Sequence, residues 1–336
     1  MRFAGVVSTA AGTVAVAAIA VLVVHAATGS PAGTGPPASP ARRGGTVSQA
    51  PALPAVTGGR RLPGPLYGVT VDDTARLGRL VRSLRHLRRM PTTRVVFNVS
   101  QPVSHYAAAV RALRPASYLM GELLDSSDET LISTAALKKR VKSYLAAFGD
   151  KIDLWEIGNE VNGDWTGRHS TVSDKLTIAY REVNAAGDRT ALTLYYNVGC
   201  HDGAGELSPL AFSRRYVPRA IRTGLDYVFL SYYEDDCNGR RPKTATWTAY
   251  FRKLHTLYPH ALLGFGEIGM NDPATRNTTR AARSLIRYYY GLSIKLPDYV
   301  GGYFWWYYAE DCVPYRSKPL WTAMRTAFKA EAASPR

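Results

Sequence analysis

The sequence predicts an α/β fold, a (β/α)8 TIM barrel, and three observations support this prediction. After Pro65 the chain alternates short apolar, β-branched or aromatic runs with amphipathic stretches, which is the pattern of βα units in a parallel sheet. Eight such runs occur, and their starts lie 22 to 39 residues apart, which leaves room for one helix and two loops. No phosphate loop of the form GxGxxG follows the first or second run, which disfavours a doubly wound sheet.

The predicted strands and helices are distinguished by their hydrophobic period. In chain order the strands span Leu66 to Val71, Arg94 to Ser100, Ala116 to Leu124, Ile152 to Glu160, Ala191 to Gly199, Leu225 to Glu234, Ala261 to Met270 and Tyr299 to Tyr308. Between the strands, apolar residues recur every three or four positions, as on one face of a helix. This period is clearest at Leu77, Leu80, Val81, Leu84 and Leu87, and at Leu137, Val141, Tyr144, Leu145 and Phe148.

The N-terminal 65 residues are predicted to lie outside the barrel domain, which spans residues 66–330. Residues 1–27 combine Arg2 with an apolar run, which is typical of a signal peptide. The run is also nearly long enough for a membrane anchor, which needs roughly 17–25 residues. Residues 28–65 are rich in Pro, Gly, Ala, Ser and Thr and are predicted to be a disordered linker. We therefore expect a secreted or extracytoplasmic protein, either free or anchored to the membrane through its N-terminal segment.

The chain is strongly basic, with 42 Lys and Arg residues against 26 Asp and Glu residues and a net charge of +16. Many arginines fall on a helix face between Arg76 and Arg89, and no recognisable nucleic-acid module surrounds them. We therefore expect a solvated surface and no nucleic-acid partner. Binding of an acidic polymer is a weaker alternative, which salt-sensitive binding without hydrolysis would favour.

Three cysteines are too few for a fold that depends on disulfides, although an exported location permits one bridge. All three, Cys200, Cys237 and Cys312, follow predicted strands at the same end of the barrel. Strands five and six are neighbours, so Cys200 with Cys237 is the first expected pair. Cys237 with Cys312 is the second.

Two glutamates stand where a barrel builds its active site, at the C-terminal ends of strands. Glu160 ends the fourth predicted strand, and Glu267 interrupts the apolar run of the seventh. Burying an unpaired carboxylate costs several kcal/mol, so such residues are expected only where a site uses them. Strands four and seven lie across the barrel mouth from each other, so the two carboxyls can meet over one cleft. Two opposed carboxyls are what acetal hydrolysis requires, one to protonate the leaving oxygen and one to attack the sugar.

At these residues the sequence resembles glycoside hydrolase clan A, the retaining (β/α)8 glycosidases. The resemblance covers essentially everything after Pro65, and it implies that Glu160 is the acid/base and Glu267 the nucleophile. The matching motifs are Asn159-Glu160, Ser231-Tyr232-Tyr233, Gly266-Glu267-Ile268-Gly269 and Trp305-Trp306.

The same resemblance implies roles for the neighbouring residues. Asn159 would bind the 2-hydroxyl of the sugar, and Tyr233 would hold the Glu267 carboxylate. Trp305 or Trp306 would form the platform under the sugar. Adjacent strand residues point to opposite faces, so one residue of each aromatic pair is expected in the core.

One departure from the clan concerns the early strands, where a basic residue usually lies near the catalytic end. Here Arg94 opens the second predicted strand and is therefore expected at the opposite end, which leaves a second partner for Glu267 unassigned. Asn98, Glu122 and Asp202 are candidate sugar contacts by position only, and a solvated loop position is an equal alternative for each.

The sequence therefore predicts a monomeric retaining glycoside hydrolase that cleaves β-linked O-glycosidic bonds of an extracellular glycan or glycoside without a cofactor. His201 has acidic neighbours, but no HExxH motif or Cys/His spacing accompanies it, so no metal is expected. The alternative is a catalytically inactive carbohydrate-binding barrel at the cell surface, in which Glu160 and Glu267 are members of structural ion pairs. The sequence identifies neither the sugar nor the bond.

Overall fold

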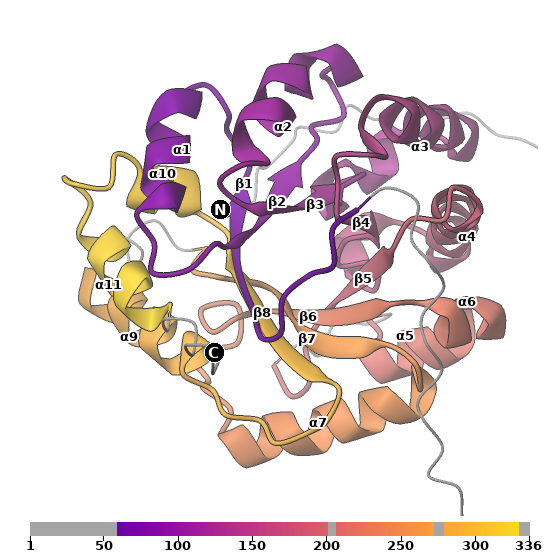
Figure 1. Cartoon of the computed structure of the whole chain (residues 1–336). Coiled ribbons are helices and arrows are strands. Elements are labelled where there is room, and N and C mark those ends of the chain that lie inside the picture. The colour runs from indigo at the N-terminus through magenta and orange to yellow at the C-terminus, as the bar shows by residue number, and fades with distance from the viewer. Residues whose placement is uncertain (1–58, 201–205, 272–278, 329–336) are drawn as a thin grey trace, which may run out of the picture. The chain divides into compact units, whose positions relative to one another are not determined.

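The computed structural model describes residues 59–200, 206–271 and 279–328, and this part of the chain contains a closed barrel of eight strands (Figure 1). Each strand pairs in parallel with the next, and β8 pairs with β1, which closes the sheet. The predicted (β/α)8 fold is thereby confirmed. The strands are β1 (Leu66–Val71), β2 (Thr92–Val96), β3 (Tyr118–Glu122), β4 (Leu154–Gly158), β5 (Thr190–Tyr195), β6 (Tyr227–Tyr233), β7 (Leu262–Gly269) and β8 (Tyr299–Trp305).

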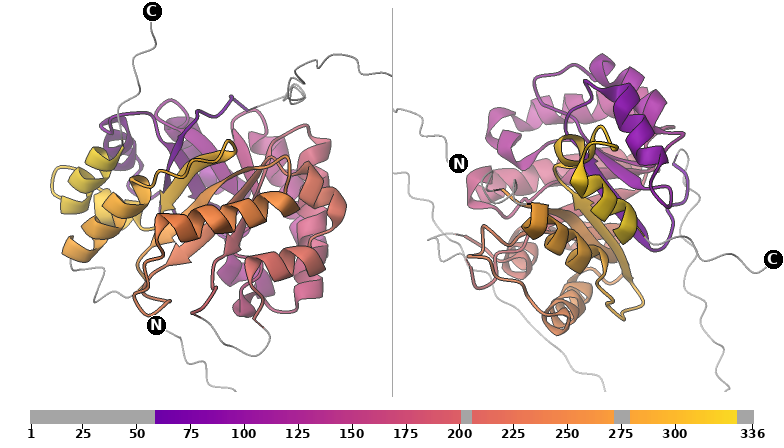
Figure 2. Two further views of the ribbon diagram at one scale, coloured as in Figure 1. Left: turned by 90° about the horizontal axis from the view of Figure 1, so that it is seen from below. Right: turned by 90° about the vertical axis from the view of Figure 1, so that its left-hand side faces the viewer.

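Helices surround the strands on the outside, as the further views in Figure 2 also show. Ser133 and Ser208 cap α3 and α5 by accepting hydrogen bonds from Ala136 N and Ala211 N. The helices are α1 (Leu77–Arg85), α2 (Ala107–Leu113), α3 (Thr134–Phe148), α4 (His169–Ala185), α5 (Pro209–Tyr216), α6 (Arg219–Gly224), α7 (Thr244–Leu257), α9 (Thr279–Tyr290), α10 (Tyr308–Cys312) and α11 (Pro319–Ala327). Three short 3-10 turns are η1 (Val103–Tyr106), η2 (Ser126–Leu131) and η3 (Asp164–Thr166).

Two apolar clusters account for the core, and the strands contribute to both because their side chains alternate between faces. The larger cluster joins the outer face of the sheet to the helices, with Val95 and Trp155 among its members. The smaller cluster includes Met120, Leu154 and Phe229 from three strands and contains no helix residue, so it fills the interior of the barrel. Charged residues are buried farther along the same strands, and they form the site described below.

Most strands end earlier than the sequence predicts, because their last residues leave the ladder to form loops. The fourth strand stops at Gly158, so Glu160 lies just beyond it. The second strand begins at Thr92 and ends at Val96, which makes Arg94 its middle residue instead of its first. This shift of two residues matters for the site.

The barrel makes contacts with the chain before the predicted boundary at residue 66. Arg60 pairs with Asp153 at 2.7 Å and donates to the carbonyl oxygens of Arg114 and Ser117, and its guanidinium covers the ring of Tyr118. These partners precede or begin β3 and β4, so the segment packs on the N-terminal end of the barrel. The last residues of the predicted linker are therefore part of the folded domain.

Within the described residues, no helix is long and apolar enough to cross a membrane. The predicted signal or anchor segment, residues 1–27, lies outside the described residues. Residues 28–58 of the predicted linker also lie outside them.

Candidate active site

Five ionisable residues, contributed by β2, β3, β4, the segment just after β4, and β7, meet at the C-terminal half of the barrel. We call Arg94, Glu122, Glu156, Glu160 and Glu267 the charged centre. Arg94, Glu122 and Glu156 are fully buried, whereas Glu267 and Glu160 keep 4% and 7% of their surface exposed. The first three therefore lie inside the protein, and the last two keep a small solvent-exposed area.

Arg94 is the cation of the charged centre. Its Nη1 donates to Glu267 Oε2 at 2.5 Å and its Nε donates to Glu156 Oε2 at 2.6 Å, while Glu122 Oε2 lies 3.2 Å from the same Nε. The expectation that Arg94 lies at the wrong end of the barrel is therefore wrong. Its strand begins two residues earlier than predicted, and its long side chain reaches Glu267 from the middle of β2.

Three donors surround the Glu267 carboxylate. Tyr233 donates its hydroxyl to Oε1, and Oε2 accepts from Arg94 and, at 3.3 Å, from Asn159 Nδ2. Burial raises the pKa of Glu267, while Arg94 and Tyr233 act against this rise. The arrangement favours the ionised form as far as a buried position allows.

Glu160 has a different environment. Its oxygens accept from two hydroxyls, Ser231 Oγ and, at 3.2 Å, Ser126 Oγ, and among the described residues no cation lies within 4 Å of it. Burial raises the pKa of Glu160 well above its usual range, and the negative charge of Glu267 raises it further. Both effects favour the protonated form of this carboxyl.

The backbone at both glutamates departs from regular geometry. Glu160 has φ of 45°, a left-handed conformation that non-glycine residues seldom adopt and that costs about 1–3 kcal/mol. On the other side, the β6–β7 register shifts between Leu230 and Ser231, so that Glu267 lies opposite Ser231. Such a bulge re-aims a side chain, and here it brings Glu267 toward the residue that bonds Glu160.

Glu156 and Glu122 lie side by side beneath the two outer glutamates, since their Cα atoms are partners in the β3–β4 register. Glu156 also accepts a hydrogen bond from Thr193 Oγ1. A Cβ at Gly266 would lie 2.5 Å from that hydroxyl oxygen, so a glycine is required beside Glu267 for β7 to approach β5 this closely.

The aromatic pairs divide as strand alternation requires. Trp306 is half-buried, and the guanidinium of Arg94 lies 5.1 Å from its ring centroid, so this ring borders the charged centre. Trp305 is fully buried in the larger core cluster and donates its Nε1 to Asp311. Tyr232 likewise belongs to the core cluster, whereas Tyr233 faces Glu267.

Three of the predicted sugar contacts fall in different places. Asn98 is exposed, accepts hydrogen bonds from Ser100 with its own Oδ1, and lines a separate cavity of about 370 Å³ with Gln101. Glu122 is fully buried, so a sugar has no surface there to contact. Asp202 lies outside the described residues.

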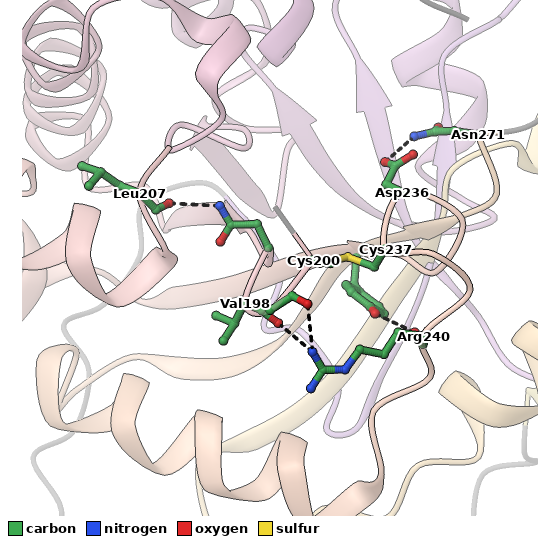
Figure 3. Close-up of a disulfide and its surroundings, with 10 residues drawn as sticks. Val198, Cys200, Leu207, Asp236, Cys237, Arg240 and Asn271 are labelled. Carbon is green, nitrogen blue, oxygen red and sulfur yellow. Dashed lines mark hydrogen bonds between the residues drawn. A yellow bond between two sulfur atoms is a disulfide. The ribbon is translucent and has the colours of Figure 1, made fainter. Parts of the chain in front are cut away.

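A disulfide joins Cys200 to Cys237, the first of the two expected pairs, and Cys312 is free and buried. Figure 3 shows the bridge between the segments that follow β5 and β6, close to Arg240, which donates to the Val198 carbonyl at 3.3 Å. In the same view Asn271 donates to Asp236 at 2.8 Å, which ties the segment after β7 to the one after β6.

Among the residues that the structure describes, no group of three or more His, Cys, Asp or Glu side chains is arranged to hold a metal ion. The charged centre already contains its own cation, and the carboxylates of Glu122, Glu156 and Glu267 are directed toward it.

Sequence reasoning missed Arg94 as a partner of Glu267 and gave no role to Glu156. The rule that singled out Glu267, a charge inside an apolar strand, applies equally to both residues. Arg94 lies between Thr93 and Val95, and Glu156 lies between Trp155 and Ile157. Applied to every strand, the rule would have found the whole charged centre.

No protein-family model and no curated protein matches this sequence. Among solved structures, a Bacteroides ovatus GH5 xyloglucanase in complex with a XXXG heptasaccharide aligns with a TM-score of 0.51 and 15% identity, over 79% of this chain and 74% of that chain. A Thermobacillus composti GH10 xylanase aligns with a TM-score of 0.50 and 11% identity, over 78% of this chain and 97% of that chain.

The chain spans only 38% of a third structure, the FMN-binding β-glucuronidase from Facaelibacterium prausnitzii L2-6, which aligns with a TM-score of 0.44 and 12% identity over 74% of this chain. Clan A glycosidases are thus among the solved structures that share this closed eight-stranded parallel barrel. At such low identity the likeness concerns the fold.

Proposed function

We propose that this protein is a retaining glycoside hydrolase that cleaves β-linked O-glycosidic bonds, with Glu160 as the acid/base and Glu267 as the nucleophile. The observation that carries the proposal is the unequal environment of the two carboxyls. Glu267 accepts from an arginine, a tyrosine and an asparagine, whereas Glu160 accepts from two serine hydroxyls. One group is thereby set to be ionised and the other to be protonated, as acid and nucleophile must be.

In the first step the Glu160 carboxyl protonates the glycosidic oxygen as that bond breaks, and a Glu267 oxygen bonds the anomeric carbon. The sugar is then covalently held as a glycosyl ester, and Glu160 is a carboxylate. In the second step Glu160 takes a proton from water, which attacks the anomeric carbon and releases Glu267. Two displacements on one carbon restore its original configuration.

Neighbouring residues fit supporting roles in this reaction. Asn159 Nδ2 lies 3.3 Å from a Glu267 oxygen, so it can also reach a sugar hydroxyl beside the anomeric carbon. The half-buried ring of Trp306 offers an apolar face next to the charged centre, which suits the C–H face of a sugar. The fold likeness to a xyloglucanase and a xylanase agrees with a glycan substrate.

We propose further that the enzyme acts outside the cytoplasm on a glycan or glycoside. The apolar segment within residues 1–27 supports export. The Cys200–Cys237 disulfide supports it as well, because such bridges persist mainly in oxidising compartments.

The test is a screen of aryl β-glycosides and of plant and microbial polysaccharides with the wild type, Glu267→Ala and Glu160→Ala. Glu234→Gln is the matched control, because Glu234 is also a buried glutamate at the end of β6 but pairs with Arg241 at 2.6 Å, outside the charged centre. We expect hydrolysis by the wild type and the control, its loss in both alanine variants, and a product of retained anomeric configuration by NMR.

Activity that survives in Glu267→Ala would refute the nucleophile assignment, and a product of inverted configuration would refute the retaining mechanism. Glycan binding without turnover by the wild type would favour the alternative of an inactive carbohydrate-binding barrel.

A further inference from the structure

Arg94 is in contact with three carboxyl groups, and its single positive charge can neutralise only one of them. Glu122, Glu156 and Glu267 all lie within 3.2 Å of its nitrogens, and among the described residues it is the one cation within 4 Å of any of them. Three ionised carboxylates around one guanidinium would leave two uncompensated charges in a fully buried position, which is strongly unfavourable. At least one of these groups must therefore hold a proton.

Hydrogen bonds indicate which group that is. Glu267 accepts from three donors, and Glu156 accepts from Thr193 Oγ1 and from Arg94 Nε. Neither oxygen of Glu122 has a hydrogen-bond partner in the described part of the chain, although both are buried. A carboxylate without donors is the least stable of the three in its charged form.

The groups that face Glu122 from each neighbouring element agree with this assignment. Among these groups, Arg94 on β2 is the cation that favours ionisation of Glu122. The Nε–H of Arg94 is already directed to Glu156 on β4. Glu156, Asp125 in the loop after β3, and Glu267 on β7 all carry negative charge that opposes its ionisation. Burial raises the pKa of Glu122 well above its usual range, and of these groups only Arg94 lowers it.

We propose that Glu122 and Glu156 share one proton and one negative charge, that the proton resides on Glu122, and that the charge on Glu156 holds Arg94 in place against Glu267. Both are positioning residues, since neither touches the sugar. The pair is adjacent in the β3–β4 register, and both carboxyls contact the same Arg94 nitrogen, so either one can carry the charge that pairs with Arg94 without a rearrangement of the barrel.

The consequence for Glu267 rests on the proposed function. With Glu122 neutral, Arg94 pairs with two carboxylates, Glu156 and Glu267. The total charge around Arg94 then stays constant if either Glu122 or Glu156 is replaced by a neutral residue. Removal of the Glu156 charge alone is expected to make Glu122 release its proton and take over. The pKa of Glu267, the proposed nucleophile, is therefore expected to change little when Glu122 or Glu156 alone is replaced.

Infrared spectroscopy tests the protonation directly, because a carboxylic acid and a carboxylate absorb at different frequencies. At neutral pH we expect the difference spectrum of wild type and Glu122→Gln to contain a carboxylic acid band. The same band should be absent from Glu156→Gln and present in the control Glu234→Gln. A carboxylate band in the first difference spectrum, or persistence in Glu156→Gln of the same acid band assigned to Glu122, would overturn the proposal.

Unfolding as a function of pH gives a second readout that needs no activity. The folded protein keeps a proton that the unfolded chain releases above the ordinary glutamate pKa of about 4.3. The wild type should therefore lose stability relative to Glu122→Gln as pH rises, by about tenfold in the unfolding equilibrium constant per pH unit. If the ratio of the unfolding equilibrium constants of wild type and Glu122→Gln is independent of pH from about 5 to 8, Glu122 is not neutral in the folded protein.

Glu122→Asp, which keeps the acid, guards against a folding defect. If Glu122→Gln does not fold, the infrared comparison is made with Glu122→Asp: an acid band that is lost in Glu122→Asp/Glu156→Gln supports the proposal, and a carboxylate band from position 122 contradicts it.

The pH profile of kcat/KM ties the pair to the reaction. We expect Glu122→Gln to leave the acidic limb, which Glu267 sets, unmoved, and Glu122→Gln/Glu156→Gln to move it to lower pH because no negative charge then remains beneath Arg94. A shift of that limb in Glu122→Gln alone would overturn the proposal. If no substrate is ever hydrolysed, the proposed function fails, while the infrared and unfolding results still decide the protonation.

Discussion

The two ends of β4 each place one carboxylate in the interior, and the two carboxylates have opposite surroundings. Asp153, just before the strand, pairs with Arg60 at 2.7 Å and with Arg114 at 3.6 Å, and it accepts from Leu119 N at 2.8 Å. Glu160, just after the strand, has two hydroxyl donors, and within the described residues no cation is paired with it.

The comparison separates a structural charge from a chemical one. A buried carboxylate whose charge is fully compensated contributes to the fold. A buried carboxylate that lacks a cation and lies beside a second carboxylate has a raised pKa, as a group that donates a proton requires. The N-terminal end of the barrel is therefore built for stability and the C-terminal end for reaction, as in other barrels.

The largest expected effect is on activity. Glu160→Gln removes the proposed acid but keeps the side-chain volume, and general acid catalysis contributes about 10²–10⁴-fold, so kcat should fall by that factor. The wild type should stay active to higher pH than an ordinary glutamate acid permits, because burial and Glu267 raise the pKa of Glu160. The alkaline limb should be absent from the pH profile of the variant. An unchanged profile would remove Glu160 from the acid role.

The second effect is on stability, at the other end of the same strand. Asp153→Ala leaves Arg60 and Arg114 without their buried partner, and breaking such a pair costs about 3–5 kcal/mol of unfolding free energy. Urea denaturation measures this loss. The kcat/KM of the folded fraction should equal that of the wild type. A loss of activity in fully folded Asp153→Ala would contradict the assignment of stability to the N-terminal end of the barrel and of reaction to its C-terminal end.

A smaller effect is expected from the disulfide. Cys237→Ser opens the Cys200–Cys237 bridge, which closes a loop between positions 37 residues apart, and such bridges typically stabilise by about 2–4 kcal/mol. Thermal unfolding of the variant and of the reduced wild type should give the same lowered Tm. Cys312→Ser is the control, because Cys312 is free and this variant keeps the bridge, so its Tm should still fall when reductant is added.

The smallest predicted effect sharpens the description of the catalytic end. Tyr233 donates to the charged form of Glu267 and so lowers its pKa, which means that Tyr233→Phe should raise it. Because Glu267 must be ionised to attack, the acidic limb of kcat/KM should move to higher pH in the variant. Limbs that coincide in variant and wild type would show that Tyr233 does not influence Glu267.

Much of the barrel could be predicted because the relevant signals are local. The apolar runs that became β1 and β6 are recognisable within a few residues, since a buried parallel strand is apolar on both faces. Predicted strand ends were less accurate. Residues such as Asn98 and Glu160 continue the run in the sequence but have left the ladder, and the point of departure depends on partners from neighbouring strands.

By itself the sequence determined the number and order of the strands, the division of Trp305 and Trp306 between two faces, and the presence of Glu160 and Glu267 at strand ends. Closure of the barrel decided what lies around them. Arg94 reaches Glu267 from a residue 173 positions away, and the β6–β7 bulge aligns Glu267 with Ser231. Contacts of this kind depend on the register and tilt of all eight strands together, which no local stretch of sequence encodes.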